Sequence, residues 1–117
     1  MTAKTKSPRW TLVTKLTDYW SNAPEIAPER YRHSFPSREA AEQELARQAN
    51  EVIDHIISDI ENDHSVNGDN TAVADLEFEV DDDFISVEDT RKALEKGVEN
   101  ITVEHGYYEF EGYITAR

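Results

Sequence analysis

Residues 38–62 read REAAEQELARQANEVIDHIISDIEN and form the most regular stretch of the chain. Apolar residues recur there mostly at steps of three and four positions: Leu45, Ala49, Val52, Ile53, Ile56 and Ile60. This recurrence matches the repeat of an α-helix, about 3.6 residues per turn, and places them in one stripe. Ser37 precedes the stretch, and its hydroxyl can accept a backbone N–H of the first turn. The sequence therefore predicts a long helix over residues 38–62 with one apolar side.

Two strands are expected before this helix. In residues 9–17, Trp10, Leu12 and Leu16 alternate with polar residues, as in a half-buried strand. Residues 30–35 alternate in the same way and end at Pro36, so the two strands can pair as a hairpin. Residues 18–29 contain two prolines, which predicts a loop between them. Three large side chains of this loop are expected to fold back on the core: Tyr19, Trp20 and Ile26.

The second half of the chain predicts three more strands and a short helix. Residues 72–80 place Ala74, Leu76, Phe78 and Val80 on one face, with acidic residues between them. Residues 86–89, SVED, have the form of a capping box and open a helix that should end near Lys96, before Gly97. The last two strands flank a turn at His105-Gly106. A two-residue turn there would pair Val103 with Tyr108 and Ile101 with Phe110.

The resulting order, ββαβαββ, predicts an α+β fold. A mostly antiparallel sheet with the long helix packed on one face would bury the apolar side of every strand. Residues 1–8 are polar and are expected to be a flexible tail, and residues 9–117 are expected to form a single domain. The alternation does not specify the order of the strands in the sheet.

The composition points to a cationic partner. The 117 residues include 25 Asp and Glu against 12 Lys and Arg, a formal net charge of −13, and most acidic residues follow position 38. Such a charge repels nucleic acid and anionic lipid, so neither direct nucleic-acid binding nor membrane binding is expected. The chain has no cysteine, which excludes disulfides and thiolate chemistry. No apolar run reaches the roughly 18 residues of a membrane span and no signal peptide is recognisable, so we expect a cytoplasmic protein.

The candidate binding site is the acidic stretch between residues 75 and 89, which contains no basic residue. Its carboxylates are Asp75, Glu77, Glu79, Asp81, Asp82, Asp83, Glu88 and Asp89. Alternate residues of a strand lie about 6.6 Å apart, a spacing that a phosphate-binding groove can tolerate. Arg and Lys of a target protein could pair with these carboxylates instead of with nucleic acid. The same acidity is also compatible with a solvated sheet face that turns at residues 81–83, or with a salt-adapted host.

Other patterns give no candidate for catalysis or cofactor binding. Aromatic and basic residues alternate near Trp10 and Tyr31, but the aromatic ones fall on the side expected to face the core. Residues 63–69 match the early positions of a calcium loop, which then fails because Ala74 occupies the position of the bidentate Glu. Asp54, His55 and Ser58 are close in sequence, but no glycine-rich turn supplies an oxyanion hole. We therefore expect no metal, no cofactor and no enzyme.

In general character the chain resembles the small acidic inhibitors that phages and other mobile elements make, including anti-CRISPR proteins and DNA mimics. The resemblance is carried by the acidic stretch at residues 75–89, by the acidic side of the predicted long helix and by the small, cysteine-free chain. It concerns composition and specifies no residue correspondence. It implies an inhibitor that covers the nucleic-acid-binding surface of a basic protein, such as a CRISPR effector subunit. The alternative is an antitoxin-like or accessory interaction module that binds through an apolar patch or a sheet edge.

Overall fold

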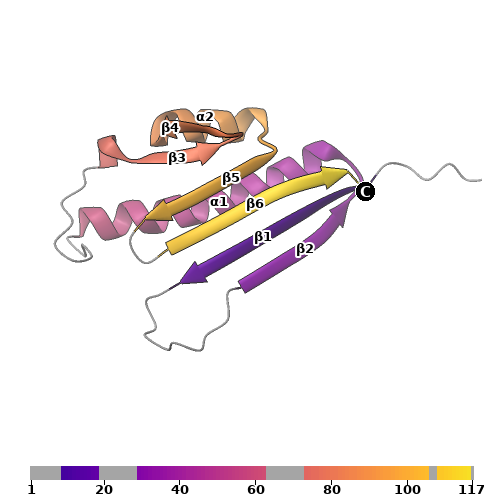
Figure 1. Ribbon diagram of the computed structural model, residues 1–117, viewed down its shortest axis with the longest axis horizontal. Helices are drawn as coiled ribbons and strands as arrows, with labels where there is room; N and C mark the ends of the chain where they lie inside the picture. Colours follow the sequence, from indigo (N-terminus) through magenta and orange to yellow (C-terminus); the bar gives the residue numbers. More distant parts are fainter. Residues whose placement is uncertain (1–8, 19–28, 63–72, 106–107, 117) are drawn as a thin grey trace, which may run out of the picture.

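The computed structural model describes residues 9–18, 29–62, 73–105 and 108–116 (Figure 1). The described elements are β1 (Trp10–Asp18), β2 (Glu29–Phe35), α1 (Arg38–Glu61), a 3-10 turn (Val73–Asp75), β3 (Glu77–Val80), β4 (Asp83–Ser86), α2 (Val87–Lys96), β5 (Asn100–His105) and β6 (Tyr108–Ala116). The predicted tail, the proline-containing loop and the calcium-loop-like segment lie outside the described residues.

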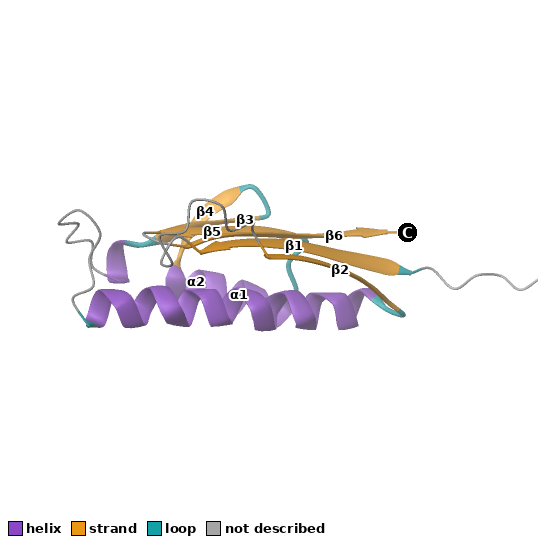
Figure 2. Cartoon of the chain, turned by 90° about the horizontal axis from the view of Figure 1, so that it is seen from below, coloured by secondary structure: helices purple, strands orange, loops and turns teal. Residues whose placement is uncertain are grey.

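The strands form one six-stranded sheet in the order β2-β1-β6-β5-β3-β4, and all neighbouring strands are antiparallel. Both helices lie on the same side of this sheet (Figure 2). The predicted α+β class is therefore confirmed. The two layers leave one sheet face that no described helix covers, and this side is called the open face below.

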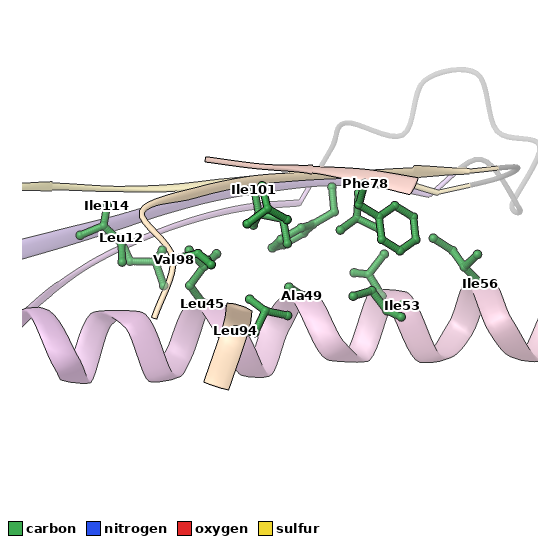
Figure 3. Close-up of a cluster of buried hydrophobic side chains, with 14 of the residues drawn as sticks. Leu12, Leu45, Ala49, Ile53, Ile56, Phe78, Leu94, Val98, Ile101 and Ile114 are labelled. Carbon is green, nitrogen blue, oxygen red and sulfur yellow. The ribbon is translucent and has the colours of Figure 1, made fainter. Parts of the chain in front are cut away.

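The core lies between α1 and the sheet (Figure 3). The predicted apolar stripe of the helix is buried, with Leu45, Ala49 and Ile53 at 0 % exposure. From the sheet side, Leu12, Phe78, Ile101 and Ile114 belong to the same cluster, and Leu94 of α2 completes it. Burial of a large apolar side chain stabilises the folded state by roughly 1.5–3 kcal/mol. The apolar stripe of α1 therefore determines which face of the sheet the helix covers.

The local signals for both helices are confirmed. The Ser37 hydroxyl accepts a hydrogen bond from the Ala40 amide at 3.1 Å, and α1 begins at the next residue, Arg38. The Ser86 hydroxyl accepts one from the Asp89 amide at 3.1 Å and starts α2. This second helix ends before Gly97, whose φ of 107° is a conformation that other residues rarely adopt. The predicted hairpin of the first two strands is also confirmed.

The predicted register of the last two strands is wrong by two residues. His105 lies opposite Tyr108, Val103 opposite Phe110, and Ile101 opposite Gly112. The reason is that β5 continues through His105, so this residue belongs to the strand and not to the turn. Because the shift is an even number, every side chain keeps the face that the alternation predicted.

The strand predicted over residues 72–80 begins only at Glu77. Val73–Asp75 form the 3-10 turn, and Ala74 is exposed instead of joining the core. The structure also adds a short strand, β4, that follows a turn at Asp81 and Asp82, with φ values of 48° and 74°. Positive φ at both central residues is the geometry of a type I′ hairpin turn, which Asp tolerates better than most residues. Two residue pairs, Glu79 with Thr102 and Val80 with Ile101, join this hairpin to β5.

A glycine in β6 sets the approach of α1 to the sheet. A Cβ atom built on Gly112 would lie 2.4 Å from Cδ1 of Leu45 and 3.3 Å from Cγ2 of Thr14. Leu45 is fully buried, so its side chain has little room to move away. Beside this contact, the Thr14 hydroxyl donates to Oε1 of Gln48 at 2.7 Å and joins β1 to the helix. The middle of α1 is thus held close to the middle of the sheet.

We expect Gly112→Ala to lower the free energy of unfolding by about 1–3 kcal/mol, because the added methyl group overlaps the Leu45 side chain. Urea denaturation of the two proteins measures the difference. The control is the same substitution in a Leu45→Ala background, where it should cost nothing or stabilise, because it fills part of the cavity. An equal loss of unfolding free energy in both backgrounds would show that the Leu45 side chain does not limit how closely α1 packs on Gly112.

Candidate interaction surface

The open face carries the side chains that alternate with the core residues of each strand. On β3 and β5 these are Glu77, Glu79, Thr102 and Glu104, and on β6 they include Glu109 and Glu111. Their neighbours Phe78, Val103 and Phe110 are buried on the helix side, which fixes the direction of the acidic side chains. Three adjacent strands therefore present carboxylates to the same side.

These six residues form two rows across β6, β5 and β3. In one row, Glu111 lies opposite Thr102, and Thr102 lies opposite Glu79. In the other, Glu109 lies opposite Glu104, and the same antiparallel register places Glu77 beside Glu104. Neighbours are about 4.8 Å apart across strands and about 6.8 Å apart along them. We call the five acidic residues around Thr102 the glutamate grid.

No ion pair recorded among the described residues involves a residue of the glutamate grid, although Lys15 borders it at Glu111. The five ion pairs recorded between described residues lie on the helices, for example Arg38 with Glu42 and Arg91 with Asp54. Within the grid, Glu104 and Glu109 face each other directly, and like charges in such a position destabilise a sheet. The fold thus tolerates a local repulsion between these two carboxylates, to which no ion pair is recorded among the described residues.

An aromatic side chain borders the grid. Phe84 lies opposite Glu79 in the hairpin of β3 and β4 and is 67 % exposed. A hollow of about 360 Å³ is lined by Glu77, Phe78, Glu79, Phe84, Thr102 and Glu104. Carboxylates beside an aromatic ring suit an Arg or Lys side chain, which can pair with the former and lie over the latter.

The eight residues predicted as the binding site do not form one surface. Glu77 and Glu79 lie in the glutamate grid. Glu88 and Asp89 lie in the first turn of α2, on the opposite layer, and Glu88 pairs with Lys92 at 3.3 Å. The other four are exposed at or near the ends of the β3–β4 hairpin: Asp75, Asp81, Asp82 and Asp83.

Asp81 has a structural role that the sequence did not reveal. Its Oδ1 accepts hydrogen bonds from the amides of Glu99 at 3.0 Å and Asn100 at 3.1 Å. Its own amide donates to the Asn100 carbonyl at 3.0 Å. The hairpin turn is therefore fastened to the start of β5 through this one residue.

Four residues of the surface were not among those predicted: Phe84, Glu104, Glu109 and Glu111. The alternation already placed Glu104 and Glu109 on the polar side of their strands. Their proximity to Glu77 depends on β5 lying between β6 and β3, which only the strand order supplies.

The remaining sequence candidates have ordinary surroundings where they are described. Trp10, Tyr31 and Phe35 pack against the core, as expected. The Asp54 carboxylate accepts from Arg91 at 2.6 Å, and the His55 ring stacks on Tyr108 with centroids 5.8 Å apart. Within residues 9–18, 29–62, 73–105 and 108–116, no group of three or more His, Asp or Glu could hold a metal ion.

A second hollow, of about 490 Å³, lies between α1 and the β1–β2 hairpin. Two of its polar residues bond to the neighbouring Glu44: Gln48 donates to its carboxylate at 2.9 Å, and Arg47 donates to the same carboxylate at 2.6 Å. The Arg47 hydrogen bond lowers the pKa of Glu44, whereas burial and the nearby Glu44 charge raise the pKa of Tyr31. Among the polar residues that line the hollow, Arg47 and Gln48 are therefore already bound to Glu44.

No significant match to this chain is found among protein-family models, curated proteins or solved structures. In the described ranges, neither α1 nor α2 combines the length and the apolar character that a membrane-spanning helix requires.

We expect Asp81→Ala to lower the free energy of unfolding by about 1–2 kcal/mol, because two charge-assisted hydrogen bonds are lost and alanine disfavours positive φ. Asp83→Ala is the control and should change it by less than about 0.5 kcal/mol. Urea denaturation compares them. Similar values for both variants would exclude the structural role of Asp81.

Acid should weaken the bond between Glu44 and Arg47. A carboxyl with a lowered folded-state pKa stabilises the fold above its ordinary value of 4.5, and this contribution disappears as the pH falls through the lowered pKa. Between about pH 6 and pH 3, Glu44→Gln should therefore lose about 0.5 kcal/mol less stability than the unaltered protein. Chemical denaturation at each pH measures this, and parallel pH profiles would contradict it.

Proposed function

We propose that the protein is a non-catalytic, cytoplasmic inhibitor that covers the nucleic-acid-binding surface of a basic partner, such as a subunit of a CRISPR effector complex. The observation that carries this proposal is the glutamate grid, five carboxylates on one uncovered sheet face without a described ion-pair partner.

The grid suits cations that normally hold phosphates. Its carboxylates stand on three hydrogen-bonded strands, so their spacing is fixed before binding and little ordering is required. Arg can bind a carboxylate bidentately, as it binds a phosphate, and Lys can approach two neighbouring carboxylates as a point charge. The net charge of −13 would also speed the encounter with a cationic groove.

A second candidate is the interaction module that binds through apolar surface. The observation that favours it is the exposure of two aromatic side chains on the open face, Phe84 at 67 % and Tyr113 at 48 %. The aromatic residues first expected to serve such binding, Trp20 and Tyr107, lie outside the described residues. The two candidates differ in salt dependence, because charge pairing weakens with salt and apolar contact does not.

The test uses two variants with equal charge change. The first carries Glu77→Lys, Glu79→Lys and Glu104→Lys in the grid. The second carries Glu39→Lys, Glu61→Lys and Glu95→Lys at exposed positions of the helices. Partner proteins are captured from host lysate at low salt, and their nucleic-acid binding is followed by gel shift with each variant added.

We expect the grid variant to lose at least about 100-fold in affinity and all inhibition, and the helix variant to keep both, because only the grid faces the partner. Equal loss in both variants would mean that overall charge, and not this surface, determines binding. Binding that survives high salt and is lost on Phe84→Ala would favour the second candidate.

A further inference from the structure

The charge of the open face changes sign along one line. On one side, β1 and β2 present Lys15, Arg30 and Arg32, and Lys15 lies opposite Arg30. On the other side, β6 begins the glutamate grid, and Lys15 lies opposite Glu111 across the boundary. The boundary, which we call the β1–β6 seam, runs between the two longest strands, which pair from Trp10 to Asp18.

The middle of the seam is uncharged. Val13 lies opposite Tyr113 there, and Tyr113 is 48 % exposed. Asn100 follows Tyr113 in the same row, on β5. The open face therefore has an apolar and aromatic centre between a basic half and an acidic half.

We propose that a second copy of this chain docks on the open face and forms a symmetric dimer, with the two-fold axis parallel to the strands and along the β1–β6 seam. Rotation by a half-turn about this axis keeps each cross-strand row at the same position along the strands. It places β1 over the β6 of the other copy. Each Lys15 then lies over the Glu111 of the other copy, and each Val13 lies over its Tyr113. Every contact occurs twice, as an isologous interface requires.

The seam gives a ring of alternating charge. Within one chain, Lys15 is beside Glu111. Across the interface, Lys15 lies over Glu111 of the other copy, and Glu111 lies over its Lys15. Arg30 lies over Thr102 of the other copy, between the carboxylates of the grid. Packed sheets cross at about 30°, so the contacts nearest the axis keep this alignment best.

Two other arrangements of two copies oppose like charges. A two-fold axis across the strands would place β2 over β2, with Arg30 and Arg32 near their own counterparts. Pairing through the exposed edge of β2 would bring the same arginines together. Charge complementarity therefore favours the seam over both.

This inference does not depend on the proposed inhibitor function, although the two share a surface. The dimer places Lys15 over Glu111 and Thr17 over Glu109 of the other copy, so a cationic partner that binds the grid would have to displace the second copy. Self-association and partner binding are expected to exclude each other. Tests on the purified chain alone separate the failure of one from the failure of the other.

The first measurement is sedimentation equilibrium of the unaltered protein at low and high salt. We expect a monomer–dimer equilibrium whose dissociation constant rises at least about 10-fold with salt, because opposite charges hold the interface. Tyr113→Ala should weaken it without any change of charge. A protein that remains monomeric at low salt at every accessible concentration would overturn the proposal without any variant.

The second measurement is a charge exchange between copies. One variant carries Lys15→Glu and Arg30→Glu, and the other carries Glu104→Lys and Glu111→Lys. Each alone should dimerise at least about 100-fold more weakly, and an equimolar mixture should form heterodimers again, because opposite charges then meet. Lys92→Glu with Lys96→Glu, on the other layer, is the matched control and should dimerise normally.

Circular dichroism establishes that each charge variant is folded before it is compared. A mixture that stays monomeric, or variants that dimerise alone as well as the control does, would overturn the seam as the interface.

Discussion

The close contact between Leu45 and Gly112 underlies the arrangement of both layers. Because Gly112 has no side chain, α1 can lie against the middle of the sheet and cover β1, β6 and β5 with one apolar stripe. α2 joins the same layer through Leu94, and Arg91 reaches Asn50 and Asp54 of α1. Both helices lie on one side (Figure 2), and on the opposite side of the sheet Glu77, Glu104 and Glu111 are exposed. The candidate interaction surface is therefore a consequence of where α1 packs.

Charged residues are arranged differently on the helices and on the open face of the sheet. On the helices, basic residues lie three or four positions from acidic ones and form ion pairs with them, such as those of Arg47 with Glu44 and Glu51. On the open face, the charges are separated into a basic and an acidic half, and Glu104 and Glu109 oppose each other. Adaptation to a salty environment alone would not require this separation, because it acts on the surface as a whole. The separation instead gives the open face one basic side and one acidic side, which suits recognition by a partner or a second copy.

Sequence patterns could predict each element and its faces, but not which elements are neighbours. The spacing from Leu45 to Ile60 and the Ser37 cap define α1, and alternation defines the faces of the strands. Alternation has a period of two, so it does not detect a shift of two residues such as that between β5 and β6. It also gives no strand order, and the grid exists only because β5 lies between β6 and β3. From the sequence, Asp81 was grouped with its acidic neighbours. Its structural role could not be predicted, because it depends on a positive φ in the turn and on bonds to residues 99 and 100, which are distant in sequence.

The two-pair junction of β3 with β5 has a dynamic consequence. The nine-residue pairing of β1 with β6 joins the centre of the sheet firmly, whereas the hairpin of β3 and β4 is joined to β5 by two residue pairs and the Asp81 carboxylate. Local opening is easiest where fewest bonds must break, so amide protons of this hairpin should exchange with solvent before those of β6. Glu77 and Glu79 belong to the hairpin, and the other grid residues belong to β5 and β6. A cation bound across both parts would couple their motions and slow exchange in the hairpin.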